Sequence, residues 1–139
     1  MKRTYVDANV LIAAFQGKEQ ISQRAMRVLE DPDRILVVSD YLRLEVLPKP
    51  TFQKREEEIQ FMNNVFENAE NCETSAKLTA YALTLASKYN MAPMDALHVG
   101  ASVVAGVDEL VTLEKPTKPM CKVKEVNVVS IYYESETAR

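Results

Sequence analysis

Residues 3–15, RTYVDANVLIAAF, read as a short β-strand that turns directly into an α-helix. The strand is predicted to end at Val6, and the segment 8–15, which is apolar except for Asn9, is typical of a buried helix. Asp7 stands between the two, where the strand ends and the helix begins. A carboxylate at this place also has a structural explanation as the N-cap of the helix, because it accepts a backbone N–H there.

Short apolar strands alternate with helices along the rest of the chain. This alternation is typical of an α/β protein in which helices cover both faces of a parallel sheet. We therefore expect a three-layer α/β/α fold with a central parallel sheet of about four or five strands. The predicted strands are 3–6, 34–38, 71–73, 109–112 and 126–131, and the predicted helices are 8–15, 19–30, 40–47, 51–70, 74–89 and 93–105.

Prolines and hydroxyl residues set the predicted limits of the helices in the middle of the chain. Ser39 is expected to cap the helix that follows it. Pro48 and Pro50 are expected to stop that helix, because the residue before a proline avoids the helical conformation. Thr51 is then expected to cap a long amphipathic helix that continues to about residue 70.

The size and composition of the chain predict one compact domain. It has 139 residues, of which 47% are hydrophobic, and no long Gly, Ser or Pro tract interrupts them. We expect residues 1–133 to form that domain and residues 134–139 to form a flexible tail.

The sequence also predicts a cytoplasmic protein without a membrane segment. No window approaches the roughly 18 apolar residues that a membrane helix needs, and the start of the chain, Met1 to Asp7, reaches the charge of Asp7 before the apolar core of a signal peptide develops. Cys72 and Cys121 have no CxxC spacing and no His partner at metal-ligand spacing, so two free thiols are expected.

Four acids follow predicted strands or lie in the helices after them, and they are Asp7, Glu45, Asp95 and Glu114. The carboxyl ends of parallel strands meet at one edge of a sheet, so we expect these side chains to converge there. Crowded carboxylates repel each other unless a cation offsets their charge. Oxygen ligands without a His and Cys cluster favour Mg²⁺ or Mn²⁺ over zinc. Such ions activate water and neutralise charge on a phosphodiester, so the acids predict hydrolysis at phosphorus.

The acids also have structural explanations that the sequence leaves open. Asp95 at a helix start favours the helix dipole, and Glu114 has the pattern of a loop charge. Glu45 is different, because Leu44 and Val46 flank it in a helix that is apolar on several sides. A purely solvated role is therefore hardest to argue for Glu45.

Four segments resemble, in order, the motifs of the PIN domain family, and in particular of its short stand-alone members, the VapC-like toxin ribonucleases. They are YVDANVLI from Tyr5, SDYLRLEV from Ser39, MDALHVGAS from Met94 and LVTLE from Leu110. The resemblance covers nearly the whole chain. The last segment departs from the family pattern, in which an Asp usually stands at the position of Glu114.

The resemblance implies an endoribonuclease that uses Mg²⁺ or Mn²⁺ to hydrolyse RNA phosphodiester bonds. Asp7 and Asp95 would bind the ion directly, and Glu45 would bind or position it through water. Glu114 would complete the cluster. Polar neighbours that would orient water, phosphate or the acidic helix are Asn9, Ser39 and Thr112.

Basic side chains are candidates for contact with RNA phosphates, although a solvated charged face is the alternative explanation. For His98, three residues after Asp95, the alternative is a packed helix residue. The net charge of −3 and the pI near 5.3 do not exclude RNA, because acids at a metal site lower the pI and bound cations reverse the local field. The candidate phosphate contacts are Arg43, Lys49, Lys54, Arg55 and His98.

The resemblance also implies partners. A toxin of this kind would be shielded by a small antitoxin. The apolar helix face formed by Ile59, Met62 and Phe66 is the predicted place for a homodimer or partner contact.

Three other classes of protein remain as alternatives. A catalytically weakened PIN fold that binds RNA or protein is favoured by Glu114 and the acidic pI. A receiver domain would carry an adjacent pair of acids after its first strand, but Ala8 and Asn9 follow Asp7. A phosphatase with an aspartyl-phosphate intermediate would carry Asp at the position of Asn9.

Overall fold

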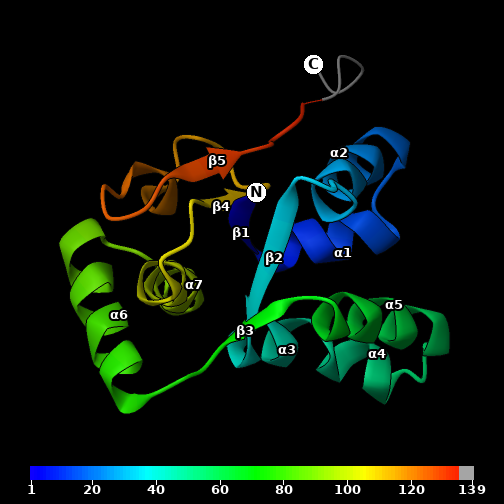
Figure 1. Ribbon diagram of the computed structural model, residues 1–139, viewed down its shortest axis with the longest axis horizontal. Coiled ribbons are helices and arrows are strands. Elements are labelled where there is room, and N and C mark those ends of the chain that lie inside the picture. Colours follow the sequence, from blue (N-terminus) through cyan, green and yellow to red (C-terminus); the bar gives the residue numbers. More distant parts are fainter. Residues whose placement is uncertain (135–139) are drawn as a thin grey trace.

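The computed structural model describes residues 1–134, and a five-stranded parallel sheet lies at its centre (Figure 1). Every pair of neighbouring strands is parallel. Across the sheet the strands are β3 (Glu70–Cys72), β2 (Arg34–Ser39), β1 (Lys2–Val6), β4 (Glu109–Thr112) and β5 (Val128–Ser130).

Helices lie on both faces of this sheet, so the predicted three-layer α/β/α fold is confirmed (Figure 1). The chain moves outward from β1 to β2 and β3 through one set of helices and returns to β4, on the other side of β1, through a second set. Right-handed crossovers place these two sets on opposite faces. The first set is α1 (Ala8–Gln16), α2 (Glu19–Leu29), α3 (Asp40–Val46), α4 (Pro48–Phe52) and α5 (Glu56–Glu67), and the second is α6 (Ala76–Tyr89) and α7 (Pro93–Ala105).

The strand register brings three predicted site residues to one edge of the sheet. Asp7 follows β1, and its amide donates to the carbonyl of Val111 at 2.9 Å, which continues the ladder between β1 and β4. The register of β1 with its two neighbours makes Asp7 level with Ser39 and Thr112. All three lie at the carboxyl edge of the sheet, where ligands bind in open parallel folds.

The middle of the chain differs from the sequence prediction in where its helices begin. Helix α4 starts at Pro48, because a proline in the first turn needs no N–H and its fixed φ suits a helix. Thr51 lies inside α4 and does not cap a long helix. The backbone is left-handed at Lys54, with a φ of 56°, and α5 starts only at Glu56. A 3₁₀ helix, η1 (Pro119–Lys122), lies between β4 and β5 and has no counterpart in the prediction.

The apolar face of α5 is not a free surface. Met62 is fully buried and Phe66 is only 6% exposed, because this face packs on the protein's own core. The predicted homodimer or partner contact through this face is therefore wrong for Met62 and Phe66, while Ile59 is partly exposed.

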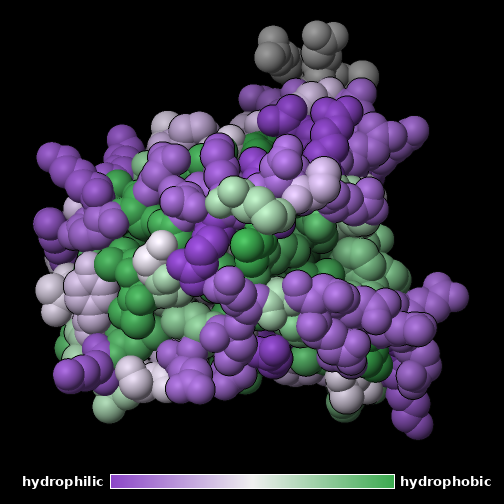
Figure 2. Space-filling view, viewed as in Figure 1, coloured by the Kyte–Doolittle hydropathy of each residue, from purple (hydrophilic) through white to green (hydrophobic). Residues whose placement is uncertain are grey.

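Apolar side chains reach the surface elsewhere. Leu44 on α3 and Phe52 on α4 are 66% and 87% exposed. On the face that carries α6 and α7, Figure 2 shows apolar side chains among hydrophilic ones. Leu83 on α6 is also exposed and lines a shallow groove of about 250 Å³ between these two helices.

Three further predictions concern the membrane, the cysteines and the C-terminal end. Within residues 1–134, every helix is too short or too polar to span a bilayer. Cys72 and Cys121 are free thiols in this part of the chain, as predicted. The predicted tail 134–139 lies outside the described residues except for Glu134.

Candidate active site

Asp7 lies at the carboxyl end of β1 and is only 5% exposed. Asp7 occupies the N-cap position of α1, and its Oδ1 accepts the N–H of Ala8, the first residue of that helix, at 2.8 Å. Its Oδ2 accepts the hydroxyl of Thr112 at 2.8 Å. Each oxygen has one protein donor and keeps a lone pair for a further partner. The capping role is therefore compatible with a role in the site.

Asp95 lies in the first turn of α7, half-buried beside two other acids. Burial raises the pKa of Asp95, and the negative charges of Asp7 and Glu114 raise it further. Burial also raises the pKa of Asp7, and the charge of Glu45 adds to this effect. The four predicted acids therefore act on one another, as crowded carboxylates do.

Glu45 reaches the same edge of the sheet from α3 and meets Asp7 and His98. One ligand atom from each of these three residues lies within 4.8 Å of the other two. An oxygen of Glu45 is hydrogen-bonded to Nε2 of His98. In the described part of the chain, Asp95 and Glu114 do not belong to this tight group, although the resemblance implied direct ligation by Asp95.

Asn9 and Thr112 lie beside Asp7, where supporting residues were expected. Nδ2 of Asn9 donates to Oγ1 of Thr112 at 3.4 Å, and Oδ1 of Asn9 accepts the N–H of Leu113 at 3.0 Å. Oγ1 of Thr112 also accepts the N–H of Glu114 at 3.1 Å. These bonds hold the start of the loop after β4 against Asp7.

Ser39 does not cap α3 with its side chain, although it occupies the N-cap position. Its hydroxyl lies 2.6 Å from the hydroxyl of Tyr5, and that hydroxyl lies 2.7 Å from Nδ1 of His98. Burial raises the pKa of Tyr5, which keeps its hydroxyl protonated. Tyr5 was not among the predicted site residues, and the contacts of His98 with Tyr5 and Glu45 were not predicted either.

The two predicted arginine contacts are engaged within the protein. Arg43 donates to Asn71 at 2.7 Å and lies 4.6 Å from the centroid of the Phe66 ring. Arg55 forms an ion pair with the buried Glu58 at 3.2 Å. Contacts of this kind hold both guanidinium groups in place and compete with binding to a phosphate.

The other predicted basic contacts differ in their exposure. Lys49 and Lys54 are exposed, and among the described residues no hydrogen bond or ion pair links them to the acids. His98 is 1% exposed, and its ring nitrogens face Tyr5 and Glu45. Its position therefore corrects the assignment of His98 as a direct phosphate contact.

Lys118 is a basic residue near the acids that was not singled out from the sequence. Its Nζ lies 4.0 Å from Oε2 of Glu114. Burial dominates the raised pKa of Asp95, and the charge of Lys118 opposes that rise. The available signal was the density of lysines after β4, where Lys115, Lys118, Lys122 and Lys124 follow Glu114.

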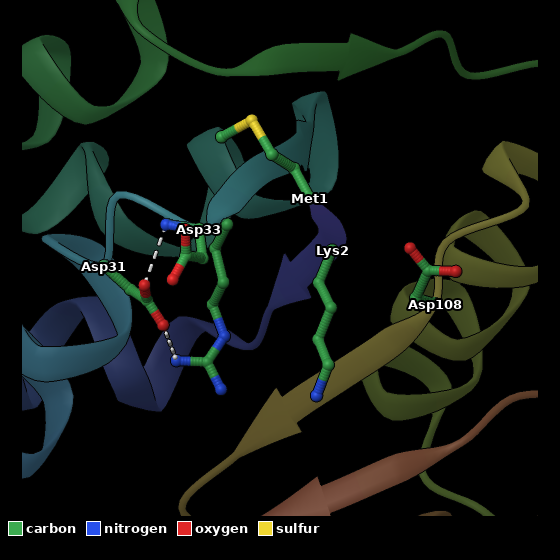
Figure 3. A pocket seen from close by; sticks show the side chains of 6 residues that line it. Met1, Lys2, Asp31, Asp33 and Asp108 are labelled. Atoms are coloured by element: carbon green, nitrogen blue, oxygen red, sulfur yellow. Dashed lines mark hydrogen bonds and ion pairs between the residues drawn. The ribbon is translucent and has the colours of Figure 1, made fainter.

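A polar hollow of about 570 Å³ at the opposite, amino edge of the sheet contrasts with this site (Figure 3). Its main charges compensate one another, because Arg34 pairs with Asp31 at 3.1 Å and with Glu109 at 2.9 Å. This balance is typical of a structural ion-pair network. The residues that line the hollow are Met1, Lys2, Asp31, Asp33, Arg34 and Asp108.

The negative charges of the acids at the carboxyl edge are balanced by far fewer paired cations than those of the hollow. Within the described residues, their ion pairs are Glu114 with Lys118 and, if the ring is protonated, Glu45 with His98. The donor set consists mainly of carboxylate oxygens, which suits Mg²⁺ or Mn²⁺. A cation here would relieve the repulsion that helps to raise the pKa of Asp95, after burial.

Comparisons with known proteins agree with this arrangement. Residues 4–115 match the protein family described as PIN domain. A comparison with curated protein sequences found no significant match.

Solved structures with this fold include toxin-antitoxin proteins. A toxin-antitoxin complex from Klebsiella pneumoniae has 21% identity and a TM-score of 0.73, with 93% of this chain and 98% of that chain covered. VapBC2 from Rickettsia felis, bound to a DNA fragment from its promoter, has 14% identity and a TM-score of 0.69, with coverage of 92% and 98%. VapC20 from Mycobacterium tuberculosis, described as a sarcin-ricin loop cleaving toxin, has 12% identity and a TM-score of 0.63, with coverage of 88% and 98%. At these identities the likeness shows the fold.

Proposed function

Because the chain belongs to the PIN domain family, a family of nucleases, we propose that it is an endoribonuclease that hydrolyses RNA phosphodiester bonds with Mg²⁺ or Mn²⁺. The observation that carries this proposal is the group of acids at the carboxyl edge, whose charge the cations of residues 1–134 leave largely uncompensated. These acids are Asp7, Glu45, Asp95 and Glu114.

In this proposal Asp7, Glu45 and Asp95 hold the ion, and Glu114 completes the cluster from the loop after β4. When bound, the ion would activate a water molecule and neutralise charge on the phosphate. Asp7 is fixed by Thr112 and by the first turn of α1, so its carboxylate needs little reorganisation to act.

RNA would approach past Lys118. This side chain is 54% exposed and lies beside Glu114, so it can meet a phosphate that sits over the acids. Lys49 and Lys54 remain proposed contacts with phosphates further along the RNA, because their side chains are exposed. A local group of lysines next to the site reconciles RNA binding with a net charge of −3.

We extend the proposal to a toxin that pairs with a small antitoxin in the cytoplasm. The similarity in fold to VapBC proteins supports this, and so do the exposed Leu44, next to Glu45, and Phe52 on the following helix. An apolar partner segment that covers these two side chains would also obstruct the acids. A homodimer stays a proposal too, and it requires a surface other than the buried face of α5.

The alternative is a catalytically weakened PIN fold that binds RNA or protein. The longer side chain of Glu114, in place of the usual Asp, favours it. Asp7→Asn and Asp95→Asn distinguish the two functions, with Asp33→Asn at the amino edge of the sheet as the matched control.

The experiment measures cleavage of a fluorescently labelled RNA pool in Mg²⁺, in Mn²⁺ and in EDTA. If the protein is a nuclease, Asp7→Asn and Asp95→Asn should each lose metal-dependent cleavage of RNA. Both variants should keep the wild-type circular dichroism spectrum, and Asp33→Asn should cleave RNA as the wild type does. A wild-type protein that neither cleaves RNA nor binds Mn²⁺ in calorimetry is instead a binding module.

A further inference from the structure

The strongest unexplained feature is a buried chain of hydrogen bonds behind Glu45. From this geometry we infer that His98 is a positioning residue: its Nε2–H donates to Glu45 and holds that carboxylate towards the site, while Tyr5 and Ser39 fix the state of the ring. The inference rests on the proposed nuclease site, because it concerns the orientation of one of its ligands.

Four elements of the fold contribute one residue each to this chain. Tyr5 lies on β1, Ser39 at the end of β2, Glu45 on α3 and His98 on α7. The two hydroxyls lie 2.6 Å apart, and the hydroxyl of Tyr5 lies 2.7 Å from Nδ1 of His98. Tyr5, Ser39 and His98 are each at most 1% exposed, so water cannot readily replace any of these bonds.

The donors and acceptors that each group offers determine the direction in which these hydrogen bonds are donated. A neutral His98 with its proton on Nδ1 would turn the lone pair of Nε2 towards a carboxylate oxygen, which is repulsive. With the proton on Nε2, that N–H donates to Glu45, Tyr5 donates to Nδ1 and Ser39 donates to Tyr5. Every polar group is then satisfied.

Glu45 is the ligand that most needs such support. Its side chain is 32% exposed on the two-turn helix α3, so it can otherwise turn towards solvent. The hydrogen bond occupies Oε1, and among the described residues Oε2 has no hydrogen-bond partner. Support of this kind behind a metal ligand commonly changes affinity or activity by roughly 10- to 100-fold.

A different role for His98 would be direct ligation of the ion, because one of its ring nitrogens belongs to the group of atoms within 4.8 Å. The two roles make opposite demands on one proton. A positioning residue keeps the proton on Nε2 when the ion binds, whereas a ligand must lose it.

His98 is the single histidine in the sequence, so ¹⁵N NMR of histidine-labelled wild-type protein reports on this ring alone. We expect a protonated Nε2 before and after saturation with Mg²⁺, and a shift of that resonance when Mg²⁺ binds to Glu45. Loss of the Nε2 proton on adding Mg²⁺ would overturn the inference. Tyr5→Phe should allow a second tautomer, while the matched control Tyr89→Phe, whose hydroxyl bonds to Glu125, should leave the spectrum unchanged.

Calorimetry with Mn²⁺ then separates positioning from simple packing. His98→Leu should weaken Mn²⁺ binding by roughly 10-fold or more. His98→Gln, which keeps an N–H donor, should recover part of that loss even if both variants melt at the same lower temperature. Equal Mn²⁺ affinity in wild type and His98→Leu would overturn the inference while leaving the nuclease proposal intact. A wild-type protein that binds no Mn²⁺ and cleaves no RNA would overturn both.

Discussion

The hydroxyl of Thr112 donates to Oδ2 of Asp7 at 2.8 Å and thereby joins the ends of the two central strands, β1 and β4. Thr112 is fully buried, and its oxygen also accepts the N–H of Glu114. The side chain of Thr112 therefore holds both Asp7 and the loop that carries Glu114. This bond helps to explain how Asp7 stays in place beside other carboxylates.

Thr112→Val tests this relationship, because it keeps the shape of the side chain and removes the hydroxyl. We expect a loss of about 1–3 kcal/mol in the free energy of unfolding, since Asp7 and the amide of Glu114 each lose a buried partner. Urea denaturation measures this loss, and RNA cleavage should fall with it. Thr84→Val on the exposed side of α6 is the control. Equal stability of the two variants would count against the bond.

Asp95→Asn should stabilise the protein in EDTA, and more so at neutral pH than in acid. Burial raises the pKa of Asp95, and nearby acids add to it, so the folded state binds this proton more tightly than the unfolded state. The stability that the protonated carboxyl provides is complete below about pH 4 and is lost as the pH rises through the folded pKa.

Urea denaturation of wild type and Asp95→Asn between about pH 4 and pH 7 measures the effect. The gain in stability from the substitution should grow with pH, and saturating Mg²⁺ should reverse it by stabilising the wild type. A gain that is constant with pH would mean that Asp95 does not lie in a repulsive cluster.

Glu109→Gln at the opposite edge of the sheet should show the reverse pH dependence. Burial alone would raise the pKa of Glu109, but hydrogen bonds from Thr4 and Arg34 and the charges of Arg34 and Lys2 lower it overall. Its stabilisation is present above the unfolded pKa and is lost as the pH falls through the folded one. We expect a loss of about 1–3 kcal/mol at pH 7. The loss should shrink below about pH 4. RNA cleavage at saturating Mg²⁺ should not change.

Lys118→Ala should weaken RNA binding without changing the melting temperature. If Lys118 contacts one phosphate, the slope of log affinity against log salt should fall by about 0.7 for single-stranded RNA. Fluorescence anisotropy with catalytically inactive Asp7→Asn as the background measures both quantities. Lys77→Ala, an exposed residue on α6, is the control, and an equal effect of the two substitutions would remove Lys118 from the RNA path.

The parts of the fold that depend on local patterns could be predicted from the sequence. The strand before Asp7 and the helix after it lie within one residue of their predicted limits, at Lys2–Val6 and Ala8–Gln16. The alternation of strands and helices also predicted that the carboxyl ends of the strands meet at one edge. The approach of the four acids to that edge followed from topology.

The partners of His98 could not be predicted, because they depend on how distant elements cross. Tyr5 and His98 are 93 residues apart in the chain. That the apolar face of α5 packs on the protein's own core could not be predicted for a similar reason. An apolar stripe shows that a helix is covered but does not show by what, and the ring of Phe61 on α5 lies 5.4 Å from that of Phe15 on α1. The helix before Pro48 ends there as predicted, but Pro48 also begins α4, because a proline suits the first turn of a helix.

The central claim, that distant carboxylates form one cation site, is tested most directly by an anomalous difference map from a crystal soaked in Mn²⁺. The account predicts a peak between the carboxylates of Asp7 and Asp95, within reach of Glu45. A fully soaked crystal with no peak at the carboxyl edge of the sheet, or with peaks only at the amino edge near Asp33, would contradict it.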